Sequence, residues 1–232
     1  MPSVPREHSK KWPHRVFRTE GLSPWDYLAL DRVQRKTQSD ILGGVSRGEF
    51  LFSELSPVVT LGRKLTLDSF AAQAQAIMKQ GVAVIETDRG GNETYHGPGQ
   101  WVLFPVARLV DLTGSTTGVR IVVRKLLDIA VTAAASLGVA TQCRDGQELG
   151  VWTERGKLAS VGIAIKSGVV LHGLSFNIYP TSLSFAGINP CGISNARPAF
   201  VAEHLTTPVR DHELLMRRGL EALQAAADRV FS

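Results

Sequence analysis

The sequence predicts an α+β fold in which a mixed, mostly antiparallel β-sheet is flanked by α-helices. Apolar side chains recur at helical spacing over residues 67–78 and again over residues 116–137. Three strand-like segments, Glu148–Thr153, Lys157–Ile165 and Val169–Ile178, are separated by glycine-containing stretches with the length of hairpin turns. These patterns together predict an antiparallel meander against which the helices pack.

The first elements are predicted from helix-start signals and strand-forming residues. Ser23 followed by Pro24 has the character of a helix cap and first helical position, so a helix is expected over about residues 23–40. Glycines end that pattern, and two short segments, Glu49–Leu55 and Pro57–Leu61, are rich in residues suited to strands. We therefore expect a pair of strands after the first helix.

The middle of the chain alternates helix, strand and loop. A helix over Leu67–Met78 should lead into Val82–Ile85, which has the character of a buried strand. A polar, glycine-rich loop over residues 88–100 then precedes the apolar strand Trp101–Val106. After the meander, leucines at helical spacing predict a terminal helix around Leu214–Leu223.

Composition bounds the domain organisation and the class of protein. The chain has 232 residues, 44% hydrophobic and 20% charged, which predicts one packed domain over residues 16–232. Residues 1–15 combine prolines with basic side chains and should form a disordered tail. No apolar run has the length of a membrane span or the character of a signal peptide, so a cytoplasmic location is expected.

Charge and cysteine content exclude several kinds of site. The net charge of +5 occurs without a long Lys/Arg block, which disfavours a nucleic-acid binder and suits either acidic protein partners or an ordinary solvated surface. The only two cysteines, Cys143 and Cys191, have no C-x-x-C spacing for zinc or redox exchange. We predict neither a metal site nor a disulfide framework.

The loop R-G-G-N-E-T-Y-H-G-P-G-Q at residues 89–100 is the first candidate for a ligand site. Its four glycines would let the backbone approach a ligand and present N–H groups to it. The loop matches neither a P-loop nor a dinucleotide-binding fingerprint. A long connection whose glycines only turn the chain explains the composition equally well, so both interpretations stay open at this point.

Two further residues could carry chemistry. Lys157 opens a strand that is almost free of charge, and from its position alone we expect a solvated side chain. Cys191 lies in the irregular segment A-G-I-N-P-C-G-I-S, where a thiol is easily exposed, whereas the setting of Cys143 suggests no role. A cysteine without further context is most often a small buried hydrophobe.

Five strings, in order along residues 20 to 200, resemble the lipoyl(octanoyl) transferase family of the biotin/lipoate ligase-type fold. They are P-V-V-T-L-G-R at residues 57–63, the loop at 89–100, G-V-W with G-K-L-A-S-V-G-I, H-G-L-S-F-N-I, and I-N-P-C-G-I. The chain departs from the family after Cys191, where I-S-N-A-R-P-A-F stands in place of the usual aromatic after the glycine.

This resemblance implies a reaction and a set of partners. The protein would transfer an octanoyl group from octanoyl-acyl carrier protein to a lysine of lipoyl domains, the first step of lipoate biosynthesis. Cys191 would carry the acyl group as a thioester and Lys157 would act as acid and base. Neither ATP nor a metal would be required, because the donor carries its acyl group on phosphopantetheine. The acceptors would be lipoyl domains of 2-oxoacid dehydrogenases and the glycine cleavage H protein, and the enzyme would be a monomer.

The resemblance also assigns substrate-binding residues. They are Arg89, Gly90, Gly91, Asn92, Glu93, Thr94, Tyr95 and His96 in the glycine-rich loop, Ser160, Val161 and Gly162 in one strand, and Gly173, Leu174 and Ser175 in the next. Two alternatives are an ATP-dependent lipoate ligase of the same fold and a non-catalytic acyl-binding module. Cys191 argues against the ligase, because adenylate chemistry does not require a thiol nucleophile, and the retention of Cys191 with Lys157 argues against the module.

Overall fold

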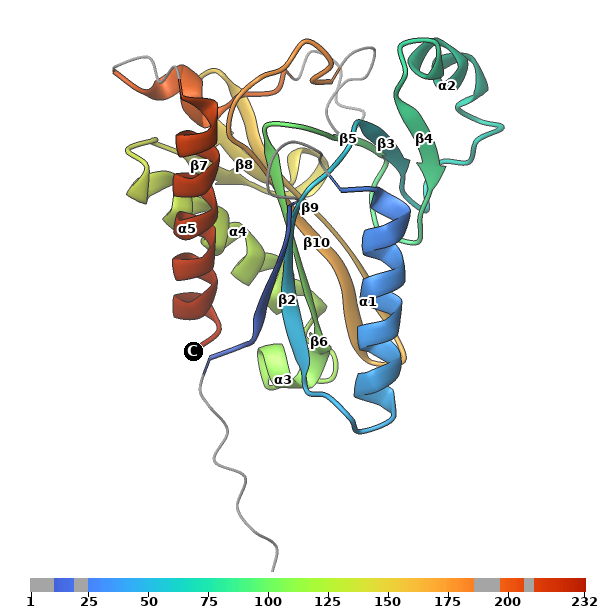
Figure 1. Cartoon of the computed structure of the whole chain (residues 1–232). Coiled ribbons are helices and arrows are strands. Elements are labelled where there is room, and N and C mark those ends of the chain that lie inside the picture. Colours follow the sequence, from blue (N-terminus) through green and yellow to red (C-terminus); the bar gives the residue numbers. More distant parts are fainter. Residues whose placement is uncertain (1–10, 19–24, 186–196, 207–210) are drawn as a thin grey trace, which may run out of the picture.

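A computed structural model describes residues 11–18, 25–185, 197–206 and 211–232 of the chain. It confirms the predicted α+β class: a large sheet has helices on both faces, and a small sheet stands beside one end of it (Figure 1).

The large sheet has seven strands and is antiparallel apart from one edge pair. In order across the sheet they are β1 (His14–Phe17), β2 (Gly48–Glu54), β6 (Gln100–Arg108), β10 (Val169–Asn177), β9 (Gly156–Lys166), β8 (Gly150–Thr153) and β7 (Gln142–Arg144). Only β1 and β2 are parallel. The predicted meander is confirmed as β8, β9 and β10.

The small sheet is formed by β4 (Ala83–Glu86), β3 (Val58–Leu61) and β5 (Glu93–His96), in that order. The two strands expected over residues 49–61 are therefore present as β2 and β3, but they belong to different sheets. The prediction that β4 is buried is wrong, because β4 is an edge strand whose Ala83 and Glu86 are exposed.

Helices cover the large sheet on both faces. Helix α1 (Tyr27–Leu42) packs on one face, and α4 (Val119–Ser136) and α5 (His212–Val230) lie on the other with the short α3 (Leu109–Thr113) (Figure 1). Helix α2 (Ala71–Met78) covers the small sheet and begins four residues later than expected. None of the helices in the described residues combines the length and apolarity needed to cross a membrane.

The first helix starts later than its sequence signals indicated. The side chain of Asp26 accepts a hydrogen bond from the Ala29 N–H at 2.9 Å and so caps α1, whereas the expected cap, Ser23, lies outside the described residues. Aspartate and serine are equally favourable N-cap residues, so the sequence alone did not distinguish Asp26 from Ser23 as the cap.

The predicted tail over residues 1–15 is too long at its C-terminal end. Trp12 is only 8% exposed because its ring stacks on Phe50, and His14 and Arg15 belong to β1. A strand of four residues is too short to produce the apolar periodicity on which the tail prediction depended.

Candidate active site

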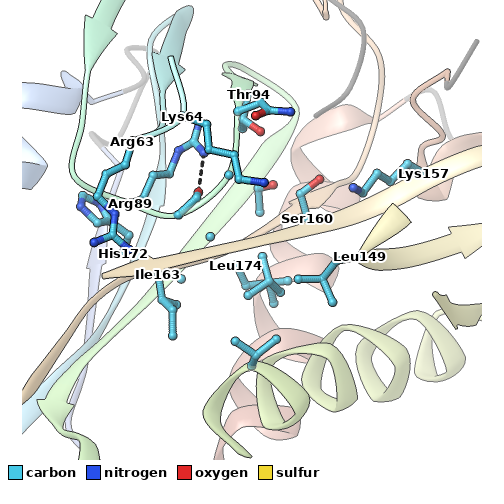
Figure 2. A pocket seen from close by; sticks show the side chains of 18 of the residues that line it. Arg63, Lys64, Arg89, Thr94, Leu149, Lys157, Ser160, Ile163, His172 and Leu174 are labelled. Carbon is cyan, nitrogen blue, oxygen red and sulfur yellow. Dashed lines mark hydrogen bonds between the residues drawn. The ribbon is translucent and has the colours of Figure 1, made fainter. Parts of the chain in front are cut away.

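A pocket of about 850 Å³ opens where β9 and β10 meet the glycine-rich loop and the start of α4 (Figure 2). The predicted site residues that line it are Arg89, Gly90, Gly91, Asn92, Thr94, His96, Lys157, Ser160, Val161, Gly162, Gly173, Leu174 and Ser175. Glu93 and Tyr95 do not line it. Cys191 lies outside the described residues.

Paired glycines allow the loop to lie against the sheet. Gly162 and Gly173 are opposite each other in the register of β9 and β10. A Cβ atom at Gly173 would lie 2.1 Å from the Leu103 carbonyl oxygen, and one at Gly162 would lie 3.1 Å from the Gly90 carbonyl oxygen. The absence of a side chain at Gly162 therefore lets the backbone of the glycine-rich loop approach β9, and its absence at Gly173 lets β10 lie close to Leu103 of β6.

The glycine-rich segment is half loop and half strand, which explains which of its residues reach the pocket. Successive side chains of a strand point to opposite faces. In β5, Thr94 and His96 accordingly face the pocket, whereas Tyr95 packs in the core of the small sheet, its ring 5.3 Å from that of Phe185. The prediction of a continuous loop over residues 88–100 is wrong for this strand.

Arg89 fixes the loop to the small sheet. Its guanidinium donates to the Thr60 carbonyl oxygen at 2.6 Å and to the Thr60 hydroxyl at 2.9 and 3.1 Å. The next residue, Gly90, donates its N–H to the Ile163 carbonyl oxygen of β9 at 2.9 Å. The loop is thus held between β3 and β9, with Arg89 itself buried.

Replacing Arg89 by lysine should lower the free energy of unfolding by about 2 kcal/mol. A lysine keeps the charge but cannot reproduce the planar fork that binds both Thr60 oxygens, and each hydrogen bond to a charged group contributes about 1.5 to 3 kcal/mol. Urea denaturation would measure the loss. Arg15→Lys, at an exposed arginine bonded to Glu49, is the matched control and should change stability by less than about 0.5 kcal/mol. Equal losses in the two variants would contradict this role of Arg89.

Lys157 is buried beside the pocket. Its exposed fraction is 2%, so the expectation of a solvated side chain is wrong. The Lys157 Nζ atom lies 5.5 Å from the centre of the Trp152 ring, and in Figure 2 the ammonium end points toward Ser160. Burial of the stem and a cation–π contact hold this ammonium at one end of the pocket.

The backbone of Lys157 pairs with the residues that follow the Cys191 segment. The Lys157 N–H donates to the Arg197 carbonyl oxygen, and the Ala199 N–H donates to the Lys157 carbonyl oxygen, both at 2.9 Å. Gly156 permits this approach, because a Cβ atom there would lie 2.3 Å from the Arg197 carbonyl oxygen. Cys191 is therefore six residues away in sequence from a segment hydrogen-bonded to Lys157.

Cys143 does not line the pocket. It lies in β7, half-buried, where burial raises the pKa of its thiol above the ordinary value. A raised pKa keeps the thiol protonated at neutral pH and makes it a poor nucleophile. This setting agrees with the sequence-based interpretation that Cys143 has no catalytic role.

Three pocket residues that the sequence analysis did not select, Tyr27, Phe104 and His172, lie toward α1. The neighbours of His172 alternate normally, with Leu171 facing α1 and Leu174 facing α4. His172 has a φ of +57°, and this left-handed conformation turns its side chain to the α1 face. The string H-G-L-S-F-N-I contained this histidine, but its conformation could not be inferred from sequence.

A hydrogen-bond network holds His172 in one tautomer. Its Nε2 atom lies 2.5 Å from the Asp88 carboxylate, so Nε2 carries the proton, and its Nδ1 atom accepts from the Tyr27 hydroxyl at 3.3 Å. Burial lowers the pKa of His172 despite the carboxylate. The hydrogen bond from His172 holds the pKa of Asp88 well below its usual range, with Arg35 and Lys166 adding to the effect.

His96 is a second neutral histidine at this end of the pocket. Its Nδ1 atom donates to the Gln100 Oε1 atom at 2.7 Å, an orientation fixed because the Gln100 amide nitrogen donates to Asn177 at 2.9 Å. Burial lowers the pKa of His96 to about 3, and the positive charge of Arg89 acts in the same direction.

The pocket combines cations with an aliphatic surface. Arg63 and Lys64, both exposed, line it next to the glycine-rich loop. Figure 2 shows Leu149 and Leu174 on the opposite side of the β9 and β10 ribbons from Lys157, toward α4. Such a pocket can bind an apolar chain and place a polar reacting group near Lys157.

Comparisons with known proteins show the family to which the chain belongs. Residues 24–223 match the family model of the lipoyl protein ligase A/B catalytic domain. The chain is 33% identical to the octanoyltransferase of Maridesulfovibrio salexigens over 84% of this chain and 88% of that one, and 35% identical to the octanoyltransferase of Desulfotalea psychrophila over 84% and 87%.

Among solved structures, the chain resembles a putative lipoate protein ligase from T. acidophilum with a TM-score of 0.64 and 12% identity, over 95% of this chain and 85% of that one. It also resembles a lipoate-protein ligase A bound with ATP, with a TM-score of 0.59 and 14% identity over 95% and 94%. At these identities the likeness shows the fold alone.

Proposed function

Since the chain belongs to the lipoyl protein ligase A/B catalytic domain family, we propose that it is an octanoyltransferase of lipoate biosynthesis. It moves an octanoyl group from acyl carrier protein to a lysine of lipoyl domains. The observation that carries this proposal is the position of Lys157, buried beside the pocket and hydrogen-bonded to the residues that follow the Cys191 segment.

The pocket offers the acyl chain a groove without side chains and an aliphatic wall. Gly162 and Gly173 line the pocket without a side chain of their own, while Ile163 and Leu174 supply apolar surface. Each methylene removed from water contributes about 0.8 kcal/mol, so the depth of such a groove can select chain length. The lining of the pocket by Arg89, Gly90, Gly91, Asn92, Thr94, His96, Ser160 and Ser175 supports the proposal that these residues bind the substrate.

In the first half-reaction the Cys191 thiolate attacks the carbonyl carbon of the octanoyl thioester. A bond from Cys191 sulfur to that carbon forms, the bond to the phosphopantetheine sulfur breaks, and the released thiolate takes a proton. One thioester replaces another of similar energy, so ATP is not consumed. The Lys157 ammonium favours the thiolate form of Cys191 by its charge and can supply the proton to the leaving sulfur.

In the second half-reaction the acceptor lysine loses a proton and its amine attacks the Cys191 thioester. An amide bond forms, the bond from carbon to Cys191 sulfur breaks, and the thiol is restored. Lys157 is the group proposed to accept the amine proton, because it lines the pocket and its backbone is hydrogen-bonded to Arg197 and Ala199, which follow the Cys191 segment in sequence.

Charge supports the proposed partners. The net charge is +5, and Arg63 and Lys64 add exposed positive charge to the pocket lining, which suits the phosphate of a phosphopantetheine arm and acidic protein surfaces. We propose no role for a metal or for ATP. Action as a monomer, use of both kinds of lipoyl-domain acceptor, and a cytoplasmic location remain predictions.

The experiment that tests the proposal is intact-protein mass measured after incubation with octanoyl-acyl carrier protein in the absence of ATP. Wild type and Cys143→Ser, the matched control, should gain one octanoyl group that is then chased onto a lipoyl domain. Cys191→Ser should gain none, because a serine hydroxyl is not ionised at neutral pH.

The other outcomes identify the alternatives. Acylation that appears only when ATP and free octanoate are supplied would reassign the chain as a ligase. Binding of the carrier without any covalent adduct or product, with and without ATP, would support a non-catalytic acyl-binding module.

A further inference from the structure

Gly150 lies where the stem of Lys157 crosses strand β8. A Cβ atom at Gly150 would lie 2.4 Å from Lys157 Cε and 3.2 Å from Lys157 Nζ. Both distances are measured to the end of the side chain that carries the ammonium. The lysine stem therefore occupies the space that a side chain at residue 150 would fill.

The pairing of β8 with β9 explains this overlap. Lys157 is opposite Trp152, and the register shifts beside this pair, because Val151 is opposite Ala159 and not Leu158. Gly150, two residues before Trp152 in β8, projects to the same face of β8 as Trp152. The stem of Lys157 runs past Trp152 into the gap left at Gly150. Lys157 itself lines the pocket, so this path brings the ammonium to the pocket rather than to solvent.

Burial restricts Lys157 to this path. Its exposed fraction of 2% leaves no route to solvent, and its backbone is hydrogen-bonded to Arg197 and Ala199. Besides Lys157, the Lys, Arg, Asp and Glu residues that line the pocket are Arg63, Lys64, Arg89, which is bonded to Thr60, and Glu148, which is bonded to Arg144 at 3.3 Å. Steric fit at Gly150 is therefore a direct determinant of where the ammonium lies.

We propose that Gly150 is a positioning residue for acyl transfer: its missing side chain forms the channel through which Lys157 reaches the reacting groups. This inference rests on the proposed function of Lys157. It implies that an alanine at residue 150 displaces the ammonium although Lys157 is still present. A displacement of 1 Å in a reacting group can lower the rate of the chemical step by about 100-fold.

The test measures the rate at which octanoyl-acyl carrier protein acylates Cys191, by intact mass, from about pH 6 to about pH 10. Four proteins are compared: wild type, Gly150→Ala, Lys157→Met and the double variant. Gly168→Ala is the control for an alanine at a glycine with positive φ: φ is +154° at Gly150 and +75° at Gly168, and a Cβ atom at Gly168 has nothing within 4 Å.

Gly150→Ala and Lys157→Met should both be about 100-fold slower than wild type at neutral pH. Both should approach the wild-type rate above the ordinary thiol pKa of about 8.5, where the thiolate forms without help. The double variant should match Lys157→Met within about twofold, because Gly150 acts only through Lys157. Gly168→Ala should keep the wild-type rate and pH profile.

Different failures separate the inference from the function on which it rests. A wild-type profile for Lys157→Met would overturn the proposed role of Lys157 and this inference with it. A second outcome would overturn only the inference. In it, the pH dependence of the acylation rate is shifted in Lys157→Met, while Gly150→Ala either keeps the wild-type rate or is slower by the same factor at every pH.

The Cβ atom of Gly150→Ala would also lie 2.6 Å from the Ala159 carbonyl oxygen, so a second measurement tests whether this contact, and not the lysine stem, prevents folding. In Gly150→Ala/Lys157→Ala the lysine stem is removed, so folding should be restored if the stem is the main obstacle. A double variant that remains unfolded while Lys157→Ala folds would assign the clash to Ala159 and overturn the inference.

Discussion

Lys157→Met is expected to slow both halves of acyl transfer by about 10²- to 10⁴-fold, the range typical of a lost general acid or base. Methionine has nearly the length of lysine and keeps the apolar contact of the stem with Trp152, so little cavity is created. What it removes is the ammonium that is proposed to favour the Cys191 thiolate and to exchange protons with the thiol and the acceptor amine.

Single-turnover mass measurements can follow the two halves separately. The first half is acylation of Cys191 by octanoyl-acyl carrier protein, and the second is loss of that acyl group to a lipoyl domain. Lys36→Met is the matched control, because Lys36 lies on the exposed side of α1 and pairs only with Asp40 within the described residues. If Lys157→Met slowed acylation but not the chase, the acceptor amine would have to lose its proton to another group.

The free energy of unfolding should fall by about 2 kcal/mol between pH 6.5 and pH 5 because of His96 alone. The pKa of His96 is about 3 in the folded protein and close to 6.5 when the chain is unfolded. The neutral imidazole therefore contributes stability that is complete above about pH 6.5. That contribution is lost as pH falls toward 3, because only the unfolded state binds the proton.

The physical cause is the burial of His96 between Tyr27 and the Gln100 amide. The rings of His96 and Tyr27 stack with centres 6.1 Å apart, and the Gln100 oxygen already accepts the Nδ1 proton. A second proton would have to be carried at Nε2 without water around it, with Arg89 nearby repelling the charge.

Urea denaturation at several pH values would measure this loss. Asparagine at residue 96 keeps a hydrogen-bond donor for Gln100 and does not titrate. Between pH 6.5 and pH 5 the free energy of unfolding of His96→Asn should therefore fall by about 2 kcal/mol less than that of wild type. The other histidines with lowered pKa values, His14 and His172, are present in both proteins and cancel in the difference. His212→Asn, at an exposed position, is the control, and its free energy of unfolding should change with pH as that of wild type does. If the free energies of unfolding of wild type and His96→Asn changed equally with pH, the role of His96 would be disproved.

The fold class was predictable because it depends on local patterns that remain visible in one chain. The stripe of apolar residues in α4 and the turns between β8, β9 and β10 each lie within a short segment, so periodicity and turn residues were enough to place them. The sheet to which each strand belongs was not predictable. β2 and β3 follow each other in sequence yet pair with different partners, and that choice depends on contacts with distant strands.

By itself, the sequence determined which residue types are available for the chemistry: the glycine-rich segment, a lysine at the start of a strand, and a cysteine followed by glycine. Only the tertiary structure decided their surroundings. It buries Lys157 across Gly150, turns His172 toward Asp88, and directs Thr94 but not Tyr95 into the pocket. Burial, backbone conformation and pairing arise from residues far apart in sequence, so no local pattern of residues could reveal them.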